Sequence, residues 1–152
     1  MDDHARWKFG LMARQVGKDF ASGFEGVVDC ALAKAAHRKI DWLIAAPIER
    51  QSLEALEKWK EWAQILKISI ADHQETRESG GESLLNAASI TFPRGSRVIA
   101  VPGKPETVRG FSANVLMTEF AFFEQPEATW KALLRLCENS FGFEYLDRHY
   151  VK

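Results

Sequence analysis

The sequence predicts an α/β fold in which a mainly parallel sheet is flanked by helices. Short continuous apolar runs are typical of strands buried on both faces of such a sheet, and longer segments with apolar residues at helical spacing lie between them. Their order, strand then helix then strand then helix, is that of a wound α/β domain. The length of 152 residues and the apolar fraction of 46% suffice for one domain with a core.

The first half of the chain contains the clearest elements. A short strand is expected at Phe9–Met12, and an amphipathic helix at Asp19–Ala36, where apolar residues recur at intervals that keep them on one face. A second core strand is expected at Trp42–Ala46, which Pro47 closes. A second amphipathic helix follows at Ser52–Leu66.

The middle of the chain predicts a loop and then a hairpin. Residues Asp72–Glu82 are polar and contain two glycines, so we expect an exposed loop or a poorly ordered excursion with no core element there. Two strand-like runs, Ser89–Phe92 and Arg97–Val101, then flank the turn sequence Pro93–Ser96. A β-hairpin is therefore predicted before the next apolar run.

The last third contains a strand, a helix and an unassigned tail. The apolar run Val115–Met117 predicts a buried strand, and Pro126–Cys137 predicts a helix with proline at its first position. From residue 138 to residue 152 aromatic residues occur without a clear period. We therefore expect one incomplete domain over residues 1–137 and a tail of uncertain structure over residues 138–152.

Composition excludes some partners and compartments. With 20 basic and 21 acidic residues the net charge is -1, so no whole-chain field attracts nucleic acid or an anionic membrane. The amino-terminal residues lack the pattern of a secretory signal, and no apolar stretch approaches the roughly 20 residues of a membrane span. Cys30 and Cys137 lack metal-ligand spacing and are expected to be buried thiols. A cytoplasmic protein without membrane contact is the simplest interpretation.

The segment Met12–Asp19 resembles a phosphate-binding loop, because it follows an apolar run and opens a helix. The pattern G-x-x-x-x-G-K-[ST] requires glycine near the phosphates, a lysine for the β and γ oxygens and a hydroxyl for Mg²⁺. Gly17 and Lys18 fit this pattern, whereas Met12 replaces the first glycine and Asp19 replaces the hydroxyl. A P-loop NTPase-like sheet is therefore expected, with Lys18 on the γ-phosphate and Arg14 supplying further positive charge.

A nucleotide hydrolase of this class also needs a carboxylate at the end of another buried strand. Glu119 follows the run Val115–Met117, and the carboxyl end of such a strand lies at the ligand crevice of an open α/β sheet. We therefore expect Glu119 to polarise the attacking water.

Taken in order, these segments resemble the ATPase domain of the large terminase subunit of tailed bacteriophages, over about Phe9 to Leu134. The segments that carry the resemblance are Ala13–Lys18, the hairpin sequence Ile90–Gly103, Arg109–Asn114 and Val115–Phe122. The resemblance implies an ATP-driven motor that moves phage DNA into a capsid. It also implies ATP and Mg²⁺ as ligands, and as partners phage DNA, the portal protein, the small terminase subunit and further copies in a ring.

The resemblance also implies residue roles. Lys18 is the Walker A lysine, Arg14 a loop arginine that stabilises the γ-phosphate, and Glu119 the Walker B glutamate. The nucleotide-binding set implied is Ala13, Arg14, Gln15, Val16, Gly17, Lys18 and Asp19. Two departures concern Mg²⁺: Thr118 stands where the Walker B aspartate is usual, and Asp19 where the Walker A hydroxyl is usual. Thr118, Asp19 and Glu119 are accordingly the expected metal-binding residues.

Two alternatives stay open at the level of sequence. Terminases carry a nuclease domain after the ATPase domain, so a truncated prophage remnant without catalysis is one alternative, binding at most nucleotide or a partner. A helicase-like ATPase shares the first motif, but no helicase signature follows it. In addition, Arg94, Arg97, Lys104 and Arg109 form a locally basic stretch that could face DNA phosphates, although charged loops are usually only solvated.

Overall fold

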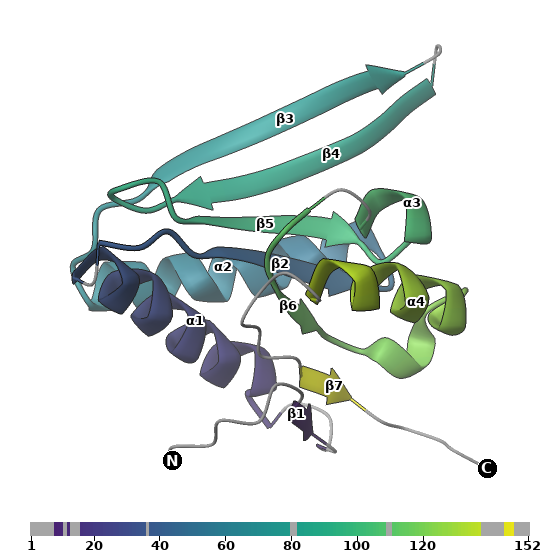
Figure 1. Ribbon diagram of the computed structural model, residues 1–152, viewed down its shortest axis with the longest axis horizontal. Helices are drawn as coiled ribbons and strands as arrows, with labels where there is room; N and C mark the ends of the chain where they lie inside the picture. The colour runs from purple at the N-terminus through teal and green to yellow at the C-terminus, as the bar shows by residue number, and fades with distance from the viewer. Residues whose placement is uncertain are drawn as a thin grey trace.

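The computed structural model describes residues 8–10, 12, 16–35, 37–79, 82–108, 111–137 and 145–147. Its described strands form one seven-stranded sheet (Figure 1). The strand order is β1-β7-β6-β2-β5-β4-β3. The strands are β1 (Lys8–Gly10), β2 (Asp41–Ala46), β3 (Ala71–Ser79), β4 (Glu82–Thr91), β5 (Arg97–Pro102), β6 (Asn114–Met117) and β7 (Tyr145–Asp147). The helices are α1 (Lys18–Ala35), α2 (Glu49–Ile65), α3 (Pro105–Val108), the 3₁₀ helix η1 (Phe120–Phe122) and α4 (Pro126–Cys137).

The sheet is mainly parallel, as predicted. Strand β2 pairs in parallel with β5, from Asp41 opposite Arg97 to Ala46 opposite Pro102, and with β6 on its other side. Strands β7 and β1 continue the parallel arrangement beyond β6, whereas β4 and β3 are antiparallel additions beyond β5. The continuous apolar runs predicted for β2 and β6 are both buried, because helices cover both sides of these strands.

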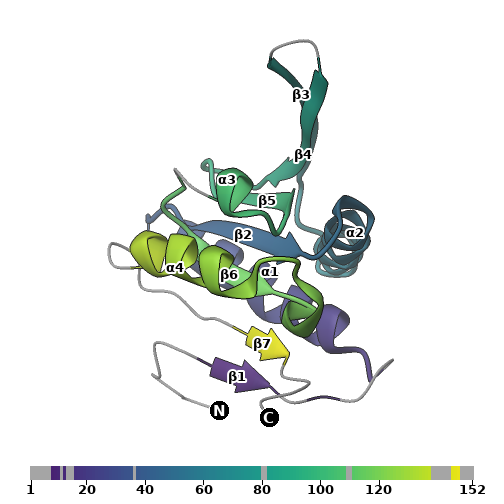
Figure 2. The same ribbon diagram turned by 90° about the vertical axis from the view of Figure 1, so that its right-hand side faces the viewer.

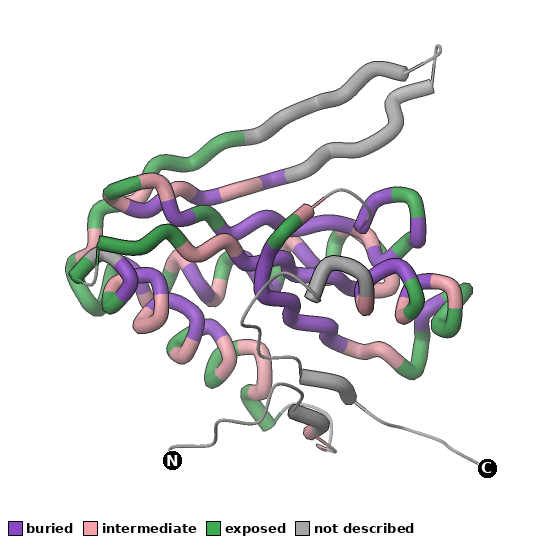
Figure 3. Tube along the Cα trace, viewed as in Figure 1, coloured by how far each residue is buried: buried purple, intermediate pink, exposed green. Residues whose placement is uncertain are grey.

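Alternate residues of β2 enter two separate core clusters. Trp42 and Ile44 pack with Val27 of α1 and Trp59 of α2. Leu43 and Ala45 belong to the cluster that includes Val108 of α3 and Leu133 of α4. Figure 2 shows α2 on one side of β2 and α4 on the other, and Figure 3 shows the central strands buried along their length. The two-sided burial follows from the period of two in a strand.

The largest correction concerns Asp72–Glu82, which was predicted to be a loop. The structure has a long antiparallel hairpin here, in which Ala71 pairs with Thr91 and Ser79 with Glu82, and which projects from the sheet (Figure 1). The strand β3 was not recognised because its sequence is polar, and where its burial is described, at Ala71, Asp72 and His73, the side chains are exposed and impose no apolar pattern. The strand pairs with β4 along its length, with a register shift between Thr76 and Glu78.

The predicted hairpin before the third core strand is confirmed. Strands β4 and β5 pair in antiparallel register, and the Phe92 amide donates to the Ser96 carbonyl over 2.8 Å. Arg94 and Gly95 both adopt left-handed backbone in the turn, with φ of 76° and 89°. Helices α1, α2 and α4 lie close to their predicted ranges, although α2 begins at Glu49, three positions before the predicted start.

A strand also forms in the carboxyl-terminal segment whose structure was left open. Tyr145–Asp147 forms β7, which lies between β1 and β6, with Lys8 opposite Tyr145 and Leu146 opposite Met117. A strand of three residues gives too short a pattern to identify from sequence. Among the described helices, none is both long enough and apolar enough to cross a bilayer.

Candidate phosphate-binding site

The amino end of α1 forms the centre of the candidate site. Gly17 has a φ of +78°, and its carbonyl accepts the first helical hydrogen bond, from the Ala21 amide over 2.9 Å. A Cβ at this position would meet no atom within 4 Å, so glycine is needed for its backbone conformation rather than for space. The first N–H groups of an α-helix have no partner inside the helix, and the helix dipole is positive at this end. Both features favour an anion beside Gly17.

Lys18 and Glu119 form an ion pair across the site. The Lys18 ammonium donates to Oε1 of Glu119, and their side chains are 17% and 25% exposed. Glu119 lies just after β6 and has left-handed backbone, with a φ of 57°. A residue other than glycine, asparagine or aspartate is uncommon in this conformation, which directs the Glu119 side chain toward α1.

Asp19 and Thr118 form a second contact between the same two segments. The Thr118 hydroxyl donates to Oδ1 of Asp19 over 2.7 Å. Thr118 is buried, and its amide donates to the Ala45 carbonyl over 3.0 Å, which fixes the end of β6 against β2. The position of this hydroxyl is therefore set by the sheet and not by the exposed loop.

The loop after β5 forms the adjacent wall. The Gly103 amide donates to the Ala46 carbonyl over 2.6 Å, and the Gly103 Cα lies against the ring of Phe123. The Thr129 hydroxyl of α4 donates to the Gly103 carbonyl over 2.9 Å. The segments that follow β2, β5 and β6 thus meet at the carboxyl ends of the parallel strands, where open α/β sheets bind ligands. Sequence reasoning missed Gly103 and Phe123, although Pro102-Gly103 after an apolar run is a recognisable signal for a tight loop.

The structure brings together four of the predicted site residues, Lys18, Asp19, Thr118 and Glu119. Val16, which is exposed, and Gly17 lie at the start of α1 as expected. Ala13, Arg14 and Gln15 lie outside the described residues, and so does Arg109 of the predicted basic stretch. Within that stretch, Arg94 and Arg97 precede β5 or begin it, whereas Lys104 follows it, so the strand separates them.

The side chains present fit a magnesium ion. Mg²⁺ prefers oxygen ligands at about 2.1 Å in octahedral geometry, so two adjacent ligand oxygens are roughly 2.9 Å apart. Oδ1 of Asp19 and Oγ1 of Thr118 are joined by a hydrogen bond of 2.7 Å, so both oxygens lie close enough to contact one ion once that bond is released. Among the described residues there is no group of three or more His, Cys, Asp and Glu side chains that could hold a metal ion. One carboxylate and one hydroxyl, with phosphate oxygens completing the shell, is a usual arrangement for Mg²⁺.

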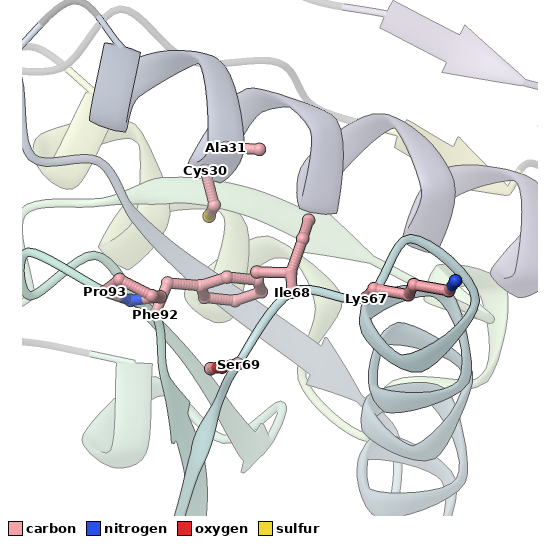
Figure 4. A pocket seen from close by; sticks show the side chains of 7 residues that line it. All are labelled: Cys30, Ala31, Lys67, Ile68, Ser69, Phe92 and Pro93. Atoms are coloured by element: carbon pink, nitrogen blue, oxygen red, sulfur yellow. The ribbon is translucent and has the colours of Figure 1, made fainter.

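A cavity of about 230 Å³ lies elsewhere in the molecule (Figure 4). Its walls come from α1, from the segment before β3 and from the turn after β4. The lining residues are Cys30, Ala31, Lys67, Ile68, Ser69, Phe92 and Pro93.

Burial raises the pKa of the Cys30 thiol to about 12, and the charges of Asp29 and Asp41 add to this effect. Cys30 is a buried thiol, as predicted, and its raised pKa means that it supplies no activated nucleophile to the cavity. The burial predicted for the Cys137 side chain falls outside the described part of the chain.

Solved structures supply the comparison, because no family profile and no curated protein matches the sequence. The large terminase of a thermophilic bacteriophage is similar, with a TM-score of 0.59 and 14% identity, over 96% of this chain and 34% of that one. The large terminase ATPase domain of Thermus phage P74-26 is similar with a TM-score of 0.57 and 16% identity, over 99% of this chain and 63% of that one. A mutant of that domain gives a TM-score of 0.56 at 15% identity.

This chain thus spans about a third of the first of these terminase chains and under two thirds of the P74-26 domain chain. The match nevertheless covers 96% to 99% of this chain, whose sheet is mainly parallel. The chain shares the fold of the large terminase ATPase domain of phage P74-26.

Proposed function

We propose that this chain binds ATP and Mg²⁺ and hydrolyses ATP as the ATPase part of a phage large terminase, coupling turnover to DNA movement into a capsid. The observation that carries the proposal is the meeting of Lys18, Asp19, Thr118 and Glu119 at the carboxyl edge of the sheet. These residues come from segments about 100 positions apart, and each has the charge or hydroxyl that phosphoryl transfer requires.

In the proposed reaction, Lys18 and the amino end of α1 bind the phosphates, and Arg14 adds positive charge to the transition state. Glu119 accepts a proton from water while the water oxygen attacks the γ-phosphorus. The bond from that phosphorus to the bridging oxygen breaks, which releases ADP and inorganic phosphate. Asp19 and Thr118 would hold Mg²⁺, which neutralises the charge that develops on the phosphate oxygens.

An alternative is a module that binds nucleotide or a partner without turnover. The observation that favours this alternative is that Asp19 and Thr118 differ from the residue types usual for catalysis at these positions. Nucleotide binding with no phosphate release would support this alternative.

ATP turnover by the purified chain separates the two functions. Lys18→Ala should abolish nucleotide binding and turnover, and Glu119→Gln should lower turnover by about 10²- to 10⁴-fold while nucleotide binding persists, as for loss of a general base. Lys131→Ala and Glu124→Gln are matched controls, because both residues are exposed and lie outside the cluster formed by Lys18, Asp19, Thr118 and Glu119. Turnover that is unchanged by Lys18→Ala and Glu119→Gln would contradict the site assignment.

The proposed DNA contact is the basic end of the sheet opposite the phosphate site. His37, Arg38, Lys39, Arg94 and Arg97 are exposed there, before β2 and around the start of β5. Asp41 already pairs with Lys39 and Arg97, and the Arg94 guanidinium contacts Nδ1 of His37 without losing its charge, so Arg38 and Arg94 supply the charge available to phosphates. Replacing Arg38 and Arg94 by alanine should weaken DNA binding at every sequence and reduce its salt dependence by about two charges. Unchanged salt dependence would exclude this surface.

The remaining partners follow from the same proposal. A ring of copies docked on a portal protein, with a small terminase subunit, would operate in the host cytoplasm. Sedimentation of the chain with and without Mg²⁺ and ATP would test the ring, and a monomer under all conditions would contradict it for this chain.

A further inference from the structure

We infer that Asp19 and Thr118 have exchanged chemical roles, so that the carboxylate and the hydroxyl of the magnesium site stand on the opposite segments from the usual arrangement. This inference rests on the proposed function, since it concerns the same site. It differs from the loss of two ligands, because both ligand types are still present.

The usual arrangement places one group on each segment. The phosphate loop carries serine or threonine after its lysine, and a second strand ends in an aspartate. In this chain the residue after Lys18 is Asp19, and the residue before Glu119 is Thr118. Each position therefore holds the type of group that belongs to the other position.

The geometry shows that the two departures concern one contact. The Thr118 hydroxyl donates to Oδ1 of Asp19 over 2.7 Å, so the two exchanged groups touch each other directly. Thr118 is only 4% exposed and its amide is bound to the Ala45 carbonyl, so its hydroxyl has little freedom to turn elsewhere. The sheet therefore presents a fixed hydroxyl to a carboxylate on α1, and an aspartate at position 118 would face the Asp19 carboxylate at the same short distance.

The exchange moves a negative charge onto the helix that receives the phosphates. Asp19 lies in the first turn of α1, where the helix dipole stabilises a carboxylate. The same carboxylate repels an incoming triphosphate unless a divalent cation lies between them. Nucleotide binding by this chain should therefore depend on Mg²⁺ more steeply than binding to a loop with a hydroxyl at this position.

Three variants test the exchange: Asp19→Thr, Thr118→Asp and the double replacement. The probe is a fluorescent, non-hydrolysable ATP analogue, titrated in Mg²⁺ and again in EDTA. In Mg²⁺ each single variant should bind about 10- to 100-fold more weakly, because the site then holds two hydroxyls or two carboxylates. The double replacement should restore affinity to within about threefold, because interacting sites compensate each other. In EDTA, Asp19→Thr should bind the analogue more tightly than the unaltered chain.

Thermal unfolding in EDTA gives a readout without ligand. Thr118→Asp should lower the melting temperature, and adding Asp19→Thr should raise it again, because the facing carboxylates are removed. Thr118→Ser keeps the hydroxyl and should leave the melting temperature and the affinity for the analogue in Mg²⁺ unchanged. Thr118→Val removes the hydroxyl and should lower both the melting temperature and that affinity. If the double variant binds the analogue in Mg²⁺ no more tightly than the weaker single variant, the exchange is overturned and the proposed function stands. Absence of analogue binding by the unaltered chain overturns both.

Discussion

The Lys18 ammonium is bound to the Glu119 carboxylate, although 101 positions separate the two residues in the sequence. In the proposed reaction Lys18 contacts phosphate and Glu119 activates water, so both groups gain new partners when nucleotide binds. A nucleotide phosphate would therefore compete with Glu119 for the Lys18 ammonium.

Glu119→Gln should consequently raise nucleotide affinity while it lowers turnover. Removing the competing charge is expected to strengthen binding by about two- to fivefold, which corresponds to a partly exposed ion pair of up to about 1 kcal/mol. Equilibrium titration with the ATP analogue measures the change, and Glu124→Gln serves as the control. Weaker binding by Glu119→Gln would mean that the pair does not oppose nucleotide entry.

Gly103→Ala should destabilise the chain and impair turnover together. The added Cβ would overlap Cε1 of Phe123, which is buried directly after η1, so the segment that carries Glu119 must shift. A loss of about 1 to 3 kcal/mol in unfolding free energy is expected for such overpacking. Urea unfolding measures it, and Phe123→Leu in the same chain should recover part of the loss. If Phe123→Leu does not raise the unfolding free energy of the Gly103→Ala chain, the assigned contact between Gly103 and the Phe123 ring is contradicted.

Gly26→Ala should cost more stability than Gly23→Ala. A Cβ at Gly26 would overlap the Trp59 ring, whereas a Cβ at Gly23 would lie 3.1 Å from its nearest neighbour. Trp59 is fully buried and cannot move aside, so we expect about 1 to 3 kcal/mol for Gly26. Gly23→Ala gains helix propensity and should be close to neutral. If the two changes lower the unfolding free energy equally in urea, Gly26 does not pack against the Trp59 ring as described.

Cys30 predicts a loss of stability at high pH. Because burial raises its pKa from 9.0 to about 12 in the folded chain, the unfolded thiol loses its proton first as pH rises. Unfolding therefore becomes more favourable between about pH 9 and pH 12, and no such effect exists below pH 9. Urea unfolding from pH 8 to pH 10 checks this in two chains, Cys137→Ala alone and Cys137→Ala with Cys30→Ala. If the unfolding free energy falls with pH equally in both chains, the assignment to Cys30 is contradicted.

The sequence allowed correct prediction of elements whose burial or turn produces a recognisable residue pattern. Strands β2 and β6 are continuous apolar runs because both faces are covered, and the turn sequence around Gly95 identified the β4–β5 hairpin. Strand β3 was missed because its sequence is polar and the side chains at its start, Ala71 to His73, are exposed, and β7 because three residues carry no period. Both strands pair with neighbours through the backbone, and backbone pairing leaves no pattern in the sequence.

The meeting of the candidate site residues was predictable in part for a similar reason. Lys18 and Glu119 belong to patterns in which chemistry dictates residue type, and the carboxyl ends of parallel strands bring such patterns together. The Pro102-Gly103 pair indicates a tight loop, but the contact of Gly103 with the Phe123 ring depends on the tertiary fold and was therefore missed. The roles of Ala13, Arg14 and Gln15 stay predictions, since these residues lie outside the described part of the chain.

The position of β7 between β1 and β6 has a consequence for biosynthesis. Among the described strands, β1 pairs only with β7, so β1 cannot join the sheet until Tyr145–Asp147 has been synthesised. A nascent chain that stops before residue 145 would have β2, β4, β5 and β6 available to pair, whereas β1 would lack the strand that links it to β6.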